Sequence, residues 1–249
     1  MVGGGQLARM THQAGIALGV RFRLLADSAD DSAAQVVHDV VLGDHRDLET
    51  VRRFAAGCDV LTFDHEHVPT AHLEALEADG VAVRPGSAAL VHAQDKIVMR
   101  ERLAEVGVPV PRWRRVRSVG DLRDFLTDEA GGVGVVKTAR GGYDGRGVRL
   151  VRGVDEAADW LDAGVPMLVE ERVDFLRELA VLVARSPSGQ AVVYPVVESV
   201  QVDGVCREVY APAPGIAADH ALAAQHAALR IAQALQVTGV MAVELFDTA

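Results

Sequence analysis

Apolar and polar residues alternate in short blocks along the first 90 residues, and these blocks predict strands and helices in turn. Runs rich in apolar residues are typical of strands, and the segments between them carry apolar residues at helical spacing. The predicted strands cover 20–26, 59–64 and 81–85, and the predicted helices cover 5–19, 47–57 and 69–80. Because short connections join these elements, we expect a parallel sheet with helices on both faces.

The pattern changes after residue 90. The predicted helices there cover 95–107, 118–130, 155–163 and 217–236, and the predicted strands cover 133–138, 148–151, 165–173 and 239–247. Between 178 and 210, three apolar runs are joined by the turn sequences SPSGQ and VDG, which predicts an antiparallel meander. We therefore predict a Rossmann-like domain at 1–90 followed by an α+β domain at 91–249.

Charge and cysteine content narrow the class of protein. The chain has 35 acidic and 25 basic residues and a net charge of −10, so general binding to nucleic acid is not expected. No apolar run is long enough to cross a membrane. Cys58 and Cys206 form no C-x-x-C pair, which argues against a disulfide scaffold and is typical of the reducing cytoplasm. We expect a cytoplasmic protein that acts on small molecules.

The first glycine motif is GGGQLA at 3–8, which fits the dinucleotide pattern G-x-G-x-x-A. Asp27 follows about twenty residues later at the end of a predicted strand, where such proteins place a ribose-binding acid. A tight turn that binds nothing explains the same residues. The strand expected before the glycines is reduced to Met1 and Val2.

The second glycine motif is GGYDGRG at 141–147, and Lys137 ends the strand before it. Glycines let backbone N–H groups turn towards an anion, and a lysine at the root of the loop would add a charge. The sequence lacks the Walker pattern of a P-loop. The motif favours a mobile lid over a nucleotide, and a plain hairpin remains the alternative.

Two later strands carry acids in unusual places. In MLVEERVDFLRE, at 167–178, the end of an apolar strand could offer its backbone to an adenine ring and Glu178 to a ribose, or it could simply end in solvated acids. In VMAVELFD, alternation puts Ala242 and Glu244 on one face. Glu244 within an apolar strand indicates either a magnesium ligand or a buried pair with an arginine.

The segment DHEHVP at 64–69 contains a further group of polar residues. His65 and His67 are two apart, so a strand would place both on one face, and zinc is conceivable, although no third ligand cluster is visible. Asp64 and Glu66 share the other face, at the carboxyl end of a parallel strand, where ligands bind in open α/β sheets.

The order of these motifs resembles that of ATP-grasp enzymes. GGGQLARM, TFDHEHVP, GGYDGRG, YPVVES and GVMAVELF together resemble the 5-(carboxyamino)imidazole ribonucleotide synthases, ATP-dependent carboxylating ligases of bacterial purine synthesis. GGYDGRG is the most specific of them, and the resemblance runs from residue 3 to the last strand. It implies an α/β fold with a Rossmann-like pre-ATP-grasp domain followed by an ATP-grasp domain.

The resemblance also implies roles for individual residues. The implied ATP-binding residues are Lys96, Lys137, Gly142, Tyr143, Asp144, Gly145, Arg146, Gly147, Val148, Glu170, Glu171, Arg172, Val173, Glu178 and Gln201. The implied substrate-binding residues are Gln6, Leu7, Asp64 and Glu66, the implied catalytic residues are Tyr143, Asp144 and Arg146, and the implied magnesium ligand is Glu244.

The chemistry implied by the resemblance uses ATP and Mg²⁺ to convert bicarbonate to carboxyphosphate, whose carboxyl group is then captured by the amine of aminoimidazole ribonucleotide. In this family a second magnesium-binding glutamate and a small third domain follow the position of Glu244. The resemblance therefore implies a C-terminally incomplete and inactive chain of an enzyme that is a homodimer when full length.

Three residues depart from the family pattern, and two other functions stay open. Asp64 replaces a glutamate and is shorter by one methylene, His65 replaces an aromatic residue, and Gln201 replaces a histidine. One alternative is a Rossmann-type NAD(P)-dependent oxidoreductase that uses Gly3 and Asp27. The other is a nucleotide-binding remnant without catalytic activity.

Overall fold

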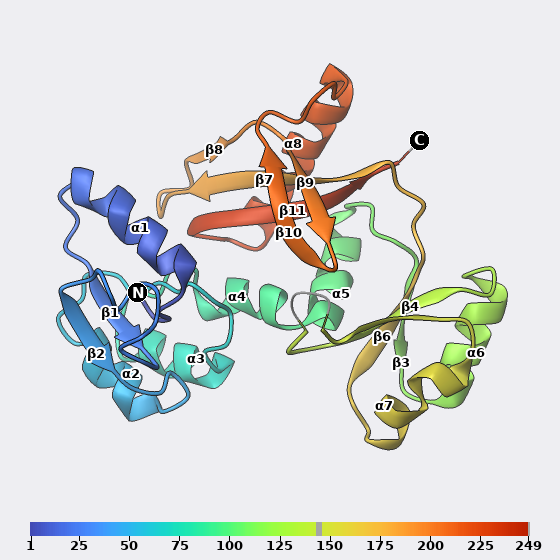
Figure 1. Cartoon of the computed structure of the whole chain (residues 1–249), viewed down its shortest axis with the longest axis horizontal. Helices are drawn as coiled ribbons and strands as arrows, with labels where there is room; N and C mark the ends of the chain where they lie inside the picture. The colour runs from blue at the N-terminus through green and yellow to red at the C-terminus, as the bar shows by residue number, and fades with distance from the viewer. Residues whose placement is uncertain (143–145, 249) are drawn as a thin grey trace. The chain divides into compact units, whose positions relative to one another are not determined.

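The computed structural model describes residues 1–142 and 146–248. The chain divides into two compact units, residues 1–91 and 92–249, which are described separately (Figure 1). No helix in the described part of the chain is both long enough and apolar enough to cross a membrane.

Unit 1 is built on parallel strand pairing, as predicted. β1 (Arg23–Ala26) pairs in parallel with β2 (Asp39–Leu42). Single-residue parallel bridges join Val2 to Leu25 and Phe63, and Leu61 to Val83. The strands predicted at 59–64 and 81–85 are thus reduced to bridges, and the strand predicted from residue 20 begins only at Arg23. The sequence prediction missed β2, whose short apolar run directly follows the polar pair His38 and Asp39.

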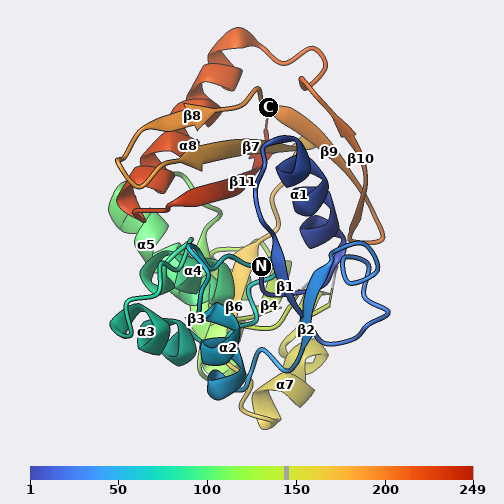
Figure 2. The ribbon, with the colours of Figure 1, turned by 90° about the vertical axis from the view of Figure 1, so that its left-hand side faces the viewer.

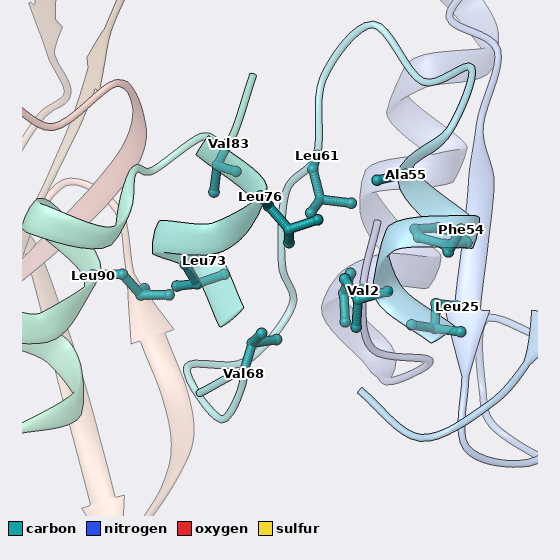
Figure 3. Close-up of a cluster of buried hydrophobic side chains, with 11 residues drawn as sticks. Val2, Leu25, Phe54, Ala55, Leu61, Val68, Leu73, Leu76, Val83 and Leu90 are labelled. Carbon is teal, nitrogen blue, oxygen red and sulfur yellow. The ribbon is translucent and has the colours of Figure 1, made fainter. Parts of the chain in front are cut away.

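The helices of unit 1 pack on two apolar clusters. These helices are α1 (Gln6–Ala17), α2 (Leu48–Ala55), α3 (Thr70–Ala78) and α4 (Ser87–Gln94), and Ala8 of α1 belongs to the smaller cluster. Figure 3 shows Phe54 of α2, Leu73 and Leu76 of α3 and Leu90 of α4 gathered with the buried residues of the bridges. The sequence prediction missed α4, because its apolar residues are spread around the helix and form no stripe.

Unit 2 begins with α5 (Lys96–Val106) and a four-stranded antiparallel sheet. The sheet order is β3-β6-β4-β5, with β3 (Trp113–Val116), β4 (Gly134–Thr138), β5 (Val148–Val151) and β6 (Met167–Glu171). One face packs on α6 (Val119–Asp128), the short helix η1 (Val154–Ala157) and α7 (Ala158–Asp162). The other face meets the start of α5, where Ile97 packs on Leu168.

A second antiparallel sheet follows, in the order β10-β9-β7-β11, with β8 paired to β7. Its strands are β7 (Arg177–Arg185), β8 (Ala191–Val193), β9 (Val197–Val202), β10 (Val205–Tyr210) and β11 (Gly239–Asp247). The prediction of three runs between 178 and 210 was therefore wrong, because the segment holds four strands. β8 and β9 are separated around Pro195, which has no N–H for a ladder.

The two faces of this second sheet differ in character. α8 (Ala218–Ala234) covers one face, where Leu179, Val181 and Val183 are buried (Figures 1 and 2). The opposite face carries Glu178 of β7 and Glu244 of β11, and its side chains are exposed or half-buried. This face is therefore open to a ligand, and the candidate site lies beside it.

Candidate active site

A pocket of about 410 Å³ lies in unit 2, between the end of β6 and the end of β11. Its lining includes several of the residues for which the resemblance implied ATP binding: Lys137, Val148, Glu170, Glu171, Arg172 and Val173. The remaining lining residues, which the sequence did not single out, are Pro111, Val135, Asp174, Phe175 and Phe246. The structure therefore brings the lysine strand and the acidic strand end to one cavity.

Apolar side chains form the walls of this pocket. Val135 and Val148 come from the first sheet, and Phe246 comes from the second. Phe175 stacks on Phe246 with ring centroids 4.6 Å apart and planes inclined by 15°. Such walls suit a flat, weakly polar ring. Alternation along β11 could have indicated Phe246, because it lies on the same face as Glu244.

A buried ion triad closes the floor of the pocket. Glu170 Oε2 lies 2.6 Å from Lys137 Nζ, and Glu170 Oε1 lies 2.6 Å from Arg100 Nε. The Glu170 side chain is only 3% exposed. Burial by itself would raise the pKa of Glu170, but the charges of Lys137 and Arg100 outweigh burial and hold this pKa below its usual value. The sequence prediction missed Arg100, although it lies one helical turn after Lys96.

The strand end after Glu170 is held by Arg112. Glu171 Oε2 lies 2.6 Å from Arg112 Nη2, and the backbone N–H of Glu171 donates to the carbonyl of Arg112. The hydrogen bond from the Arg112 side chain lowers the pKa of Glu171. Among the described residues, none accepts a hydrogen bond from the N–H of Val173. This N–H can therefore serve a ligand in the pocket.

Two carboxylates lie on the open face of the second sheet. Glu178 is opposite Phe246 in the ladder and Glu244 is opposite Ala180, so the two acids are diagonal neighbours. Partial burial, followed by the negative charge of Glu244, raises the pKa of Glu178, and Lys137 partly opposes this. Because Glu244 is exposed, a buried pair with an arginine is wrong. Gln201 lies on this same face, two residues beyond Ser199, which is opposite Glu178.

The stem of the second glycine motif is tightly closed. The N–H of Thr138 donates to the carbonyl of Gly147, which has a φ of +70°. A Cβ on Gly142 would lie 2.8 Å from the carbonyl oxygen of Arg146 and 3.5 Å from Lys96 Nζ, so this lysine lies at the root of the loop, and Arg146 at the same stem is exposed. The predicted roles of Tyr143, Asp144 and Gly145 fall outside the described residues.

In unit 1, the first glycine motif encloses a carboxylate of the protein itself. The N–H of Gly5 donates to Asp64 Oδ2 at 2.6 Å, and a Cβ on Gly3 would lie 1.6 Å from Asp64 Oδ1. An internal acid therefore occupies the N-terminus of α1, where a dinucleotide phosphate would bind. The oxidoreductase alternative loses its main support. The other predicted substrate residues of α1, Gln6 and Leu7, are exposed on its first turn.

Glu66 lies beside a group of three histidines. The rings of His65 and His67 stack at 5.1 Å, and the ring of His45 lies 4.6 Å from that of His65. The sequence prediction missed His45, which follows β2. Burial, together with the neighbouring histidines, lowers the pKa of His65, although Asp64 opposes this. His65 Nδ1 accepts a hydrogen bond from the backbone N–H of His67, so the two histidines considered for zinc contact each other.

Comparison with protein families matches both units. The family model described as "ATP-grasp domain" matches residues 101–249, and the "Ribonucleotide synthetase preATP-grasp domain" matches residues 1–94. The N5-carboxyaminoimidazole ribonucleotide synthase of Mycobacterium tuberculosis strain H37Rv is 59% identical over 252 residues. That match covers 100% of this chain and 58% of the relative, so the chain spans well under two thirds of the relative's length.

Solved structures of the same family share the fold. The N5-carboxyaminoimidazole ribonucleotide synthetase of Thermus thermophilus has a TM-score of 0.89 and 35% identity, covering 100% of this chain and 68% of that one. The N5-carboxyaminoimidazole synthase of Aspergillus clavatus, in complex with ADP and 5-aminoimidazole ribonucleotide, has a TM-score of 0.86 and 31% identity. It covers 98% of this chain and 65% of that one.

Proposed function

Because the chain belongs to the N5-carboxyaminoimidazole ribonucleotide synthase family of ATP-grasp proteins, we propose that it forms the ATP-binding part of a ligase. The ligase would carboxylate 5-aminoimidazole ribonucleotide with bicarbonate at the cost of ATP, in purine biosynthesis. The observation that carries the proposal is the pocket in unit 2, where apolar walls meet Lys137. Glu178 and Glu244 lie on the open face of the second sheet, and the charge of Lys137 acts on Glu178.

The pocket suggests how ATP binds. The adenine ring would lie between Val135 and the aromatic side chain of Phe246, with the N–H of Val173 as a donor to a ring nitrogen. Lys137 would contact the phosphates from the pocket floor and Lys96 from the root of the glycine loop. This arrangement puts the apolar and the anionic parts of ATP against surfaces of matching character.

Glu244 fits a divalent cation beside the phosphates, and Glu178, its neighbour on the same face, would accept hydrogen bonds from the ribose hydroxyls. The two acids are like charges on one face: burial, followed by the charge of Glu244, raises the pKa of Glu178, and a cation bound to Glu244 would relieve the part due to repulsion. Mg²⁺ binds oxygen ligands of this type together with phosphate oxygens. When bound, it supplies positive charge to the transferring phosphoryl group.

The reaction splits one difficult step into two. A bicarbonate oxygen attacks the γ-phosphorus of ATP, ADP leaves, and carboxyphosphate forms. The amine of the ribonucleotide then takes the carboxyl group with loss of phosphate and a proton, which gives the carbamate. Lys137 and Lys96 would offset the charge on the transferring group, and a closed glycine loop would keep water from the intermediate.

The remaining assignments concern the second substrate. Tyr143, Asp144 and Arg146 of the loop, with Gln6, Leu7 and Glu66 of unit 1, are proposed to serve the ribonucleotide and the bicarbonate-derived group. Asp64 has a different role in this proposal. Because its carboxylate already accepts from Gly5, it would support the N-terminus of α1 rather than contact substrate.

The proposal also covers the domain boundaries, the oligomeric state and the cellular compartment. The domains are residues 1–90 and 91–249, the full-length enzyme is a homodimer, and it works in the cytoplasm. Cys206 is exposed and Cys58 is half-buried, and both carry unbridged thiols, which supports a reducing compartment. Light scattering on the full-length protein tests the dimer.

The experiment has two arms. Calorimetry of the present chain with MgATP measures nucleotide binding. Phosphate release by a longer protein that contains this chain is then measured with and without 5-aminoimidazole ribonucleotide and bicarbonate. We expect release that depends on both. Release that ignores the ribonucleotide overturns the substrate assignment, and binding without any release favours the nucleotide-binding remnant.

A further inference from the structure

One arginine in unit 2 lies next to the proposed site but does not line its pocket. Arg100, on α5, and Lys137, on β4, each contact one carboxylate oxygen of Glu170, on β6, at 2.6 Å. The side chains are 14%, 21% and 3% exposed in the order Arg100, Lys137 and Glu170. The three groups are thus largely screened from solvent and sum to one positive charge.

The two cations of this triad are not equivalent. Lys137 lines the pocket, and Arg100 does not. A ligand in the pocket can therefore draw the ammonium of Lys137 away from Glu170, while Arg100 stays. Leaving a buried carboxylate without any cation is strongly unfavourable, so the departure of Lys137 depends on a second cation at Glu170.

We propose that Arg100 is a positioning residue that makes Lys137 available to the phosphates of the nucleotide. Arg100 holds the charge of Glu170, so that Lys137 can exchange a Glu170 oxygen for a phosphate oxygen. Glu170 then holds Lys137 when no nucleotide is bound. This inference rests on the proposed function, because it takes ATP as the anion in the pocket.

The charges of the triad predict when nucleotide binding takes up a proton. In the wild-type chain, exchange leaves a neutral Arg100–Glu170 pair and no proton moves. In Arg100→Met, the lysine and Glu170 form a neutral pair that resists separation. The lysine can then leave only if Glu170 takes up a proton, so nucleotide binding in this variant becomes coupled to proton uptake and weakens as pH rises.

Calorimetry of the whole chain tests this prediction with MgATP and with adenosine, which lacks phosphates. We expect Arg100→Met to weaken MgATP binding on the order of tenfold or more and to leave adenosine binding unchanged. Titrations in buffers of different ionisation enthalpy should show proton uptake in this variant only. Arg100→Lys should restore most of the affinity, and the control Arg123→Met, at an exposed arginine of α6, should change nothing.

The double variant Arg100→Met with Glu170→Gln separates charge balance from structure. It removes the carboxylate along with its partner and leaves Lys137 as a lone cation, so MgATP affinity should recover. If Arg100→Met fails to fold in a thermal melt, this double variant and Arg100→Lys carry the test. Equal losses of MgATP and adenosine binding, or no recovery in the double variant, would overturn the inference. A wild-type chain that binds no MgATP would instead overturn the proposed function.

Discussion

The carboxylate of Asp64 accepts a hydrogen bond from the backbone N–H of Gly5 at 2.6 Å, between residues 59 positions apart in the chain. The Asp64 side chain is only 4% exposed. Gly5 directly precedes α1, so the acid lies at the positive end of the helix dipole. Asp64 thus ties the start of α1 to the segment that follows the central bridges of unit 1.

Asp64→Ala is therefore expected to destabilise unit 1. The substitution leaves the Gly5 N–H without its acceptor and removes the charge at the helix terminus, at a cost of about 1–3 kcal/mol. Chemical denaturation followed by circular dichroism measures the loss. Asp59→Ala, at an exposed acid of the same segment, is the control and should change stability little. Equal stability of the two variants would contradict the structural role of Asp64.

Phe246→Ala should weaken the binding of adenosine as well as MgATP, since its ring forms a wall of the pocket and stacks on Phe175. Loss of an aromatic contact with the base predicts a fall of about tenfold in affinity for both ligands. Calorimetry gives both values. Val240→Ala, at an exposed position on the same face of β11, is the matched control. A loss for MgATP alone would show that the ring does not contact the base.

The sequence named more of the residues that line the pocket of unit 2 than of the residues that support it. Lys137 and residues 170–173 could be named because they lie at the ends of strands with clear apolar patterns, and Val148 because the glycine motif before it resembles that of the family. Arg100 could not, because an arginine on a helix reads as a solvated residue until the helix is packed on a sheet. The role of Arg100 comes from its contact with Glu170, which lies seventy residues away in the chain.

In the fold, too, the sequence predicted local patterns better than contacts between distant residues. An apolar run revealed β7, which has one buried and one half-buried face, and alternation described β11, which has one half-buried and one exposed face. Such patterns failed in unit 1, where Val2, Leu61, Phe63 and Val83 pair only through single bridges. Such short pairings are set by the packing of the whole unit rather than by local pattern. Gly3 and Gly5 likewise matched a phosphate-binding motif, but they surround the carboxylate of Asp64. A phosphate and a carboxylate both need backbone N–H groups that no Cβ obstructs, so the sequence could not distinguish the two.

Glu244→Gln should lower the pKa of Glu178, since the negative charge of Glu244 helps to raise it. A raised carboxyl pKa in the folded state means that stability is higher where Glu178 is protonated. That stability is lost as pH rises through the folded pKa, so the variant should flatten this part of the stability curve. NMR titration of the Glu178 side chain checks the direction, with Glu105→Gln as an exposed control. Mg²⁺ should lower the same pKa, and an unchanged titration in both cases would rule out a cation at Glu244 beside Glu178.

Gly147→Ala tests whether the closed stem of the glycine loop matters for nucleotide binding. Gly147 has a φ of +70°, and a Cβ there would lie 2.5 Å from Thr138 Oγ1, so the stem would have to open. Gly164→Ala is a matched control, because Gly164 has a φ of +65° but nothing within 4 Å of the added Cβ. Both variants carry the cost of a left-handed alanine, about 1–2 kcal/mol, so any difference between them reports the clash. We expect MgATP affinity to fall in Gly147→Ala and to stay unchanged in Gly164→Ala, as measured by calorimetry. Because Lys96 lies at the same stem, a fall in both variants, or in neither, would mean that stem geometry does not position this lysine for the phosphates.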